Sequence, residues 1–163
     1  MTDSESLTSL KQTLRVVEKE NHHLQSVRHR LFAGQEELNK EWLETVLNSP
    51  EGEDRLESFG AKFSRMQDTM IDKLLPRLLV AAGERPGAAI DNLNRAERLE
   101  FISDAQEWIS MRRLRNKMVH EYIDSDEEML PALIQANKFS EELKSAYEKI
   151  SKYADEHLKI SDE

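Results

Sequence analysis

Hydrophobic residues recur every three or four positions along most of the chain, which is the spacing of an amphipathic helix rather than of a strand. Runs with this spacing, separated by residues typical of turns, cover about 7–33, 36–47, 54–79, 90–102, 103–123 and 125–154. No stretch alternates apolar and polar residues as a half-buried strand would. We therefore predict an all-α fold, an antiparallel helical bundle with mostly short loops.

Glycine and proline predict where these runs end. Gly34 predicts the end of the first helix. The segment 49–52 has the composition of a turn, and 83–87 has that of a loop. Pro76 predicts a kink or a break, because a proline inside a helix costs about 3 kcal/mol.

Two capping-box patterns predict the starts of the last two helices. Ser103 with Gln106 predicts one start, and Ser125 with Glu128 predicts the other. The short helix before them is expected to turn four residues inward: Ile90, Leu93, Leu99 and Ile102.

The length and composition of the chain exclude several classes of protein. Its 163 residues suffice for one domain with its own core. The absence of cysteine removes disulfides, thiol catalysis and thiolate zinc sites. No apolar run approaches the roughly 18 residues that a membrane span requires, and the N-terminus lacks the layout of a signal peptide. We therefore expect a cytoplasmic protein without membrane contact.

Charge is unevenly distributed along the chain. The net charge of -9 argues against a whole surface that coats nucleic acid. Arg112, Arg113, Arg115 and Lys117 nevertheless crowd six positions. A local basic site on an acidic body favours a small, defined phosphate-bearing ligand over a long duplex. The alternative is an ordinary solvated helix face.

One of these arginines occupies an apolar helix face. At about 100° per residue, a single arc of the helix from Glu107 to Ile123 collects its apolar side chains, namely Trp108, Met111, Met118, Val119, Tyr122 and Ile123. Arg115 falls in the middle of that arc. A guanidinium in an apolar seam is costly unless it is paired or faces a solvated cleft. Arg115 is therefore a candidate functional residue.

The histidines do not predict a metal site. Glu20 and His23 form one Glu-x-x-His pair, whereas di-metal sites in bundles need this motif on two helices. We expect a hydrated face of mixed charge there, and neither a metal nor a cofactor.

Residues 115–122 read Arg-Asn-Lys-Met-Val-His-Glu-Tyr. This Arg-x4-His-x-Tyr spacing, with asparagine directly after the arginine, resembles the signature of HEPN-domain proteins, and within them that of the HepT-like toxins. The order of the predicted helices is similar too: a long helix, a loop, a short helix, a tryptophan-bearing motif helix and a long closing helix. The resemblance covers roughly residues 53–158. We therefore expect one domain over 1–163, in which 1–50 form an N-terminal helical extension of a HEPN-like bundle.

The resemblance implies a metal-independent endoribonuclease with its site at a homodimer interface. His120 would be the general base or acid, and Arg115 would hold the phosphate of the RNA. Asn116 and Arg112 would support the contact with phosphate or RNA. Arg115 and His120 lie five positions apart, about 140° around one helix, so two copies of the helix are the simplest way to bring them together.

The resemblance also implies a toxin–antitoxin module. A minimal nucleotidyltransferase would be the antitoxin, and Tyr122 the residue to which it attaches AMP. Phosphates added on the face of Arg115 would occupy the guanidinium and exclude RNA. Two alternatives remain open. The chain can be a non-catalytic helical subunit or substrate of such a nucleotidyltransferase, or a helical adaptor without nucleotide chemistry.

Overall fold

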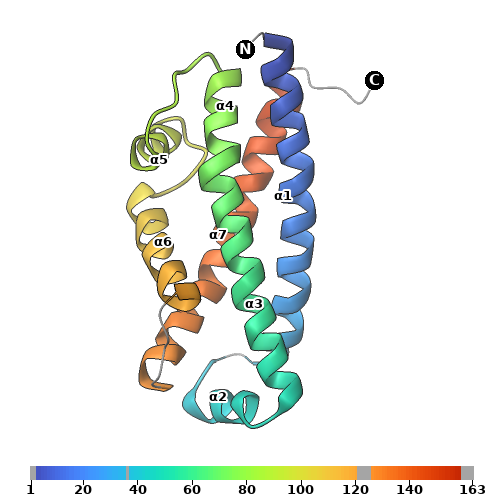
Figure 1. Cartoon of the computed structure of the whole chain (residues 1–163), viewed down its shortest axis with the longest axis vertical. Coiled ribbons are helices and arrows are strands. Elements are labelled where there is room, and N and C mark those ends of the chain that lie inside the picture. The colour runs from blue at the N-terminus through green and yellow to red at the C-terminus, as the bar shows by residue number, and fades with distance from the viewer. Residues whose placement is uncertain (1–2, 36, 121–125, 159–163) are drawn as a thin grey trace.

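A computed structural model of the protein describes residues 3–35, 37–120 and 126–158, without the side chains of 3, 117–120, 126 and 127. All regular structure in these residues is helical, which confirms the predicted all-α bundle. Three rods lie side by side (Figure 1). They are α1 (Asp3–Phe32), a rod made of α3 (Pro50–Thr69), the π-helical turn η1 (Met70–Leu74) and α4 (Leu75–Ala81), and finally α7 (Asp126–His157).

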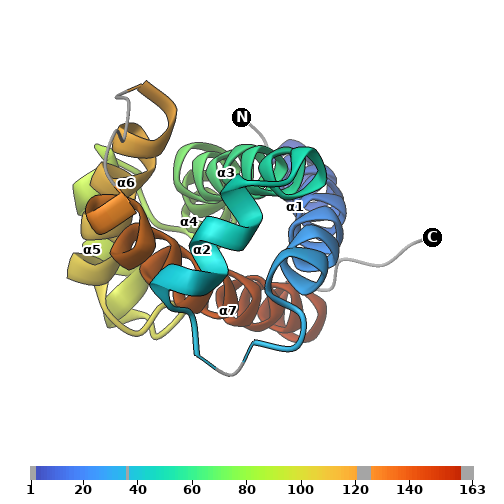
Figure 2. The same cartoon turned by 90° about the horizontal axis from the view of Figure 1, so that it is seen from below.

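Three shorter helices complete the bundle. Helix α2 (Lys40–Leu47) lies across one end of the rods (Figure 2). Helices α5 (Ala89–Arg98) and α6 (Ala105–His120) flank the α3–α4 rod on the side away from α1 (Figure 1). The order of long rod, loop, short helix, motif helix and long closing helix is the one that the hydrophobic pattern predicts.

A row of aromatic rings runs through the core and connects five helices. Successive ring centroids lie 5.1–6.3 Å apart, in mostly edge-to-face or tilted contacts that favour ring pairs beyond their burial. The row is Trp42 (α2), Phe32 (α1), Phe59 and Phe63 (α3), Phe139 (α7) and Trp108 (α6). It ends on the helix that carries Arg115.

The first helix belongs to this same core. Its heptad-like positions Leu10, Val17, Leu24 and Leu31 are all buried, and Phe32 joins the aromatic row. Helix α1 packs on α3, η1, α4 and α7. Residues 3–32 therefore form one of the three central rods of the bundle.

The start of α3 was predicted wrongly. The segment 49–52 is not a turn between helices: Ser49 is the N-cap, Pro50 opens α3, and the Ser49 Oγ accepts a hydrogen bond from Gly52 N at 2.8 Å. Proline suits the first helical turn because its missing N–H would have no partner there. The start of α2 was also misplaced, since Asn39 caps it and Lys40 is its first residue.

Pro76 was predicted to kink or break the helix. A π turn interrupts the α-helical hydrogen bonds directly before it, with Leu75 N–H bonded to Met70 O, and the rod then continues as α4. Two expectations are corrected near α5. Helix α5 ends at Arg98, earlier than predicted, and Glu100 takes a φ of 66°. Ile90 and Leu99, both expected to face inward, are exposed.

Candidate functional site

The motif helix α6 begins one residue later than its capping-box pattern suggests. The cap is Asp104, whose Oδ1 accepts from Gln106 N at 3.0 Å, and not Ser103. Glu97 of α5 accepts from Ala105 N at 3.0 Å. Carboxylates that receive free N–H groups at a helix start favour that end of the helix dipole. The start of α6 is thereby fixed against α5.

Trp108 anchors α6 on α7. Its side chain is fully buried, its ring meets Phe139 edge to face at 5.2 Å, and Nε1 donates to Glu142 Oε1 at 3.4 Å. Burial raises the pKa of neighbouring Glu107, and the charges of Glu142 and Asp104 raise it further. Arg112 and Arg115, one and two turns further along α6, therefore extend from a helix whose start is firmly packed on α7.

Arg115 points toward α3, as its place on the helical wheel predicts. Its guanidinium forms an ion pair with Asp68, and Nη1 donates to Asn116 Oδ1 at 2.8 Å. The side chain of Arg115 is 16% exposed and that of Asp68 is 38% exposed. Of the two ways to accommodate this charge, pairing or a solvated cleft, the chain supplies pairing with a carboxylate of the neighbouring helix.

A second arginine of α6 makes a parallel contact one turn earlier. Arg112 Nη2 lies 3.6 Å from Asp72 Oδ1 in the π turn, with the two side chains 40% and 52% exposed. Exposed pairs of this kind contribute little to stability because water screens them. Arg112 and Arg115 therefore share a face of α6 that is turned toward α3 and η1.

Arg115 lines a groove of about 380 Å³ over the outward face of α3 and η1. Its other lining residues follow one another at three- and four-residue spacing along that face, and are Ala61, Ser64, Arg65, Asp68, Thr69, Asp72 and Lys73. The groove thus combines two lysine or arginine side chains of α3 and η1 with the guanidinium from α6. Its size and its cations suit a phosphate group or a short polar ligand.

A buried hydroxyl lines this groove, and a half-buried carboxyl contacts it through Thr69. The Ser64 hydroxyl is buried and has no hydrogen-bond partner in the part of the chain that the structure describes. Glu20 of α1 accepts from Thr69 Oγ1 at 2.9 Å through Oε2. Burial raises the pKa of Glu20, while the Thr69 hydrogen bond and the charges of Arg65 and Lys73 oppose this.

Glu20 therefore faces Thr69, while His23 of the Glu-x-x-His pair is exposed. Among the described side chains, no group of three histidines and carboxylates is placed to hold a metal ion.

Not all of the predicted site residues can be compared. The structure brings together Arg112, Arg115 and Asn116. The backbone of His120 is the last of α6, but its side chain lies outside the described residues, and Tyr122 lies outside them entirely.

Asp68 and Asp72, the partners of these arginines, were not predicted from the sequence. Their four-residue spacing places both carboxylates on one face of a long helix, and the three-residue spacing of Arg112 and Arg115 places both arginines on one face of α6. Two such faces can pair, and this was the signal available in the sequence.

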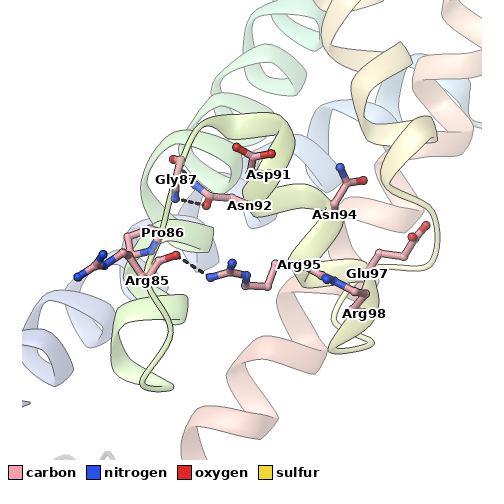
Figure 3. Close-up of a pocket in the computed structure, with 9 residues that line it drawn as sticks. All are labelled: Arg85, Pro86, Gly87, Asp91, Asn92, Asn94, Arg95, Glu97 and Arg98. Carbon is pink, nitrogen blue, oxygen red and sulfur yellow. Dashed lines mark hydrogen bonds between the residues drawn. The ribbon is translucent and has the colours of Figure 1, made fainter.

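A larger hollow of about 590 Å³ lies between α5 and the loop that precedes it (Figure 3). Some of its polar groups bind each other. The Asn92 amide accepts from Gly87 N at 2.7 Å and donates to Gly87 O at 3.0 Å, and Arg95 donates to Arg85 O at 2.6 Å. These contacts hold the loop on α5.

Comparison with models of protein families, with curated proteins and with solved structures finds no match. The resemblance to HEPN-domain proteins therefore rests on residues 115–122 and on the order of the helices. None of the described helices is long and apolar enough to cross a membrane.

Proposed function

We propose that this chain is a HEPN-like, HepT-like toxin, a metal-independent endoribonuclease that works as a homodimer and is silenced by a minimal nucleotidyltransferase. The observation that supports this most directly is the position of Arg115 in a groove, bonded to Asn116, on the helix that continues to His120. The RNA substrate would bring its phosphate to this groove.

Arg115 and Arg112 bind the phosphate in this proposal. A guanidinium stays protonated at neutral pH and can give two parallel hydrogen bonds to phosphate oxygens as their charge builds in the transition state. Asn116, already bonded to Arg115, orients the guanidinium or the phosphate. The half-buried setting of Arg115 strengthens such contacts relative to bulk water.

His120 moves the proton. An imidazole with a pKa near neutrality takes the proton of the ribose 2′-hydroxyl or returns one to the leaving oxygen. Five positions separate Arg115 from His120 on a continuous helix, so the two positions lie about 140° apart around its axis. A second copy of α6 across a two-fold axis supplies the missing group at each site, which is the reason to propose a homodimer.

Tyr122 is the proposed point of control. AMP attached to its phenol by the nucleotidyltransferase antitoxin adds negative charge beside the arginines, which then bind the modification instead of RNA. Toxin and antitoxin would be encoded together as a two-gene module. With RNA as the target, we propose that the protein acts in the cytoplasm.

Arg115→Ala and His120→Ala test the enzyme directly. Each should lower RNA cleavage by the purified protein in the presence of EDTA at least about 100-fold, and each should remove growth arrest on over-expression. Arg113→Ala is the matched control, because Arg113 is exposed on the same helix. Retained cleavage in either site variant, or cleavage that EDTA abolishes, contradicts the proposal.

The ion pair of Arg115 with Asp68 favours a second function, a non-catalytic subunit or substrate of a nucleotidyltransferase. A guanidinium that already has a carboxylate partner does not need a phosphate. This function predicts a wild-type protein that is harmless on over-expression and leaves RNA intact. It also predicts incorporation of labelled AMP in the presence of a minimal nucleotidyltransferase, and loss of that label in Tyr122→Phe.

A further inference from the structure

Two ion pairs join α6 to the α3–η1 rod, and they differ in their exposure to water. Arg115 binds Asp68, and Arg112 lies 3.6 Å from Asp72 one turn away. The carboxylates are four residues apart and the arginines three, so the pairs are neighbours along the two helices. They form a matched set: both arginines are proposed to bind phosphate, but only Arg115 is largely shielded from water.

The Arg115–Asp68 pair is the more buried of the two. Arg115 is 16% exposed and Asp68 38%, against 40% and 52% in the other pair. Water screens a shielded pair less than an exposed one, and a carboxylate uses the same donors of a guanidinium that a phosphate would use. A phosphate that binds Arg115 must therefore compete with Asp68 for the guanidinium.

The groove also offers a donor that Asp68 does not use. Ser64 lies four residues before Asp68 on α3, lines the same groove, and keeps its buried hydroxyl without a hydrogen-bond partner among the described residues. An oxyanion that replaces the carboxylate on Arg115 would meet this hydroxyl as well. The desolvation cost of the Ser64 hydroxyl would then be recovered only in the occupied state.

We propose that Asp68 is a positioning residue of the phosphate site: its carboxylate holds Arg115 in the groove when no ligand is bound, and a substrate phosphate displaces it. The identity of that ligand as RNA rests on the proposed function. The competition between carboxylate and phosphate does not, since it follows from the contacts of Arg115. Asp68 thereby sets the affinity of the site and not its chemistry.

The experiment compares Asp68→Asn with Asp72→Asn in binding a short 2′-O-methyl oligoribonucleotide at fixed salt. The methyl group blocks attack by the 2′-oxygen, so binding is measured whether or not the protein cleaves RNA. Both variants lose one negative charge on the same surface, but only Asp68→Asn removes the carboxylate that binds Arg115. We expect Kd to fall roughly 5- to 20-fold in Asp68→Asn and about twofold or less in Asp72→Asn.

Two further variants exclude a structural explanation. Asp68→Glu keeps the carboxylate and should restore affinity to near that of the wild type, with an unchanged unfolding midpoint. Arg115→Ala added to Asp68→Asn should remove the gain, because the two residues act on the same ligand. Equal effects of Asp68→Asn and Asp72→Asn, weaker binding by Asp68→Asn, or no binding by any variant would overturn the inference. Binding as expected without RNA cleavage would contradict only the proposed enzyme.

Discussion

Arg115 illustrates how a charged side chain inside an apolar seam is accommodated. Its position among Trp108 and Met111 predicts that it faces the protein, and the structure places it against α3. The orientation follows from the period of a single helix. Its partner Asp68 could not be predicted in the same way, because periodicity does not say which two helices are neighbours or how they are aligned along their axes. Ser64, which lines the groove, and Glu20, which bonds to Thr69 of the groove, were missed for the same reason.

Glu20 is a half-buried acid that bonds to Thr69 of the groove, and its protonation affects stability. Burial raises the pKa of this carboxyl above its ordinary value. The folded protein therefore holds the proton more tightly than the unfolded chain does. The resulting stabilisation is fully present below the unfolded pKa and is lost as the pH rises through the folded pKa.

Glu20→Gln should remove this loss. We expect the variant to be more stable than the wild type at about pH 7, and to show no such advantage at about pH 4, where the carboxyl is largely protonated. The free energy of unfolding in urea, measured at both pH values, checks the sign. Glu18→Gln, exposed on the same helix, controls for the loss of one negative charge. An advantage that is larger at the lower pH would contradict the assignment.

At the scale of elements, the junction between α2 and α3 shows why a local pattern was misread. Ser49, Pro50 and Gly52 suit a turn, yet they are the cap, the first residue and the third residue of α3. Gly52 is buried, and a Cβ placed on it would lie 2.2 Å from the carbonyl oxygen of Val46. The glycine is thus required for a close approach of two helices, which no spacing within the segment reveals.

Gly52→Ala should destabilise the protein in spite of the better helix propensity of alanine. The propensity gain is about 1 kcal/mol, whereas the clash with backbone atoms of Val46 forces α2 and α3 apart. We expect a net loss of about 1–3 kcal/mol in the free energy of unfolding. Gly87→Ala is the control, because its added Cβ would meet Asp91 at an ordinary 3.6 Å. Equal stability of the two variants would show that α2 shifts without cost.

At the scale of the whole molecule, the bundle has one continuous core. The all-α class and the order of the helices around α6 could be predicted, because amphipathic runs and their breaks depend only on residues close together in the sequence. The central position of α1 could not, since a helix with an apolar stripe packs equally well as an outer layer. Only the burial of its stripe from Leu10 to Leu31, together with Phe32 in the aromatic row, establishes it.

Neighbouring valines of α1 test this arrangement with the same substitution. Val17 is fully buried and Val16 is 49% exposed. We expect Val17→Ala to lower the free energy of unfolding by about 2 kcal/mol, through lost burial and the remaining cavity. Val16→Ala should change it by less than about 0.5 kcal/mol. Circular dichroism during thermal unfolding should show a single transition in both, whereas a separate early transition in Val17→Ala would indicate that α1 is an independent layer.

The two tryptophans terminate the aromatic row at its α2 and α6 ends, and both are buried. A Trp42→Phe protein would keep one indole, Trp108, two helical turns before Arg115 on α6. The emission spectrum of that indole would then report whether the motif helix stays packed on α7 when an anion binds in the neighbouring groove.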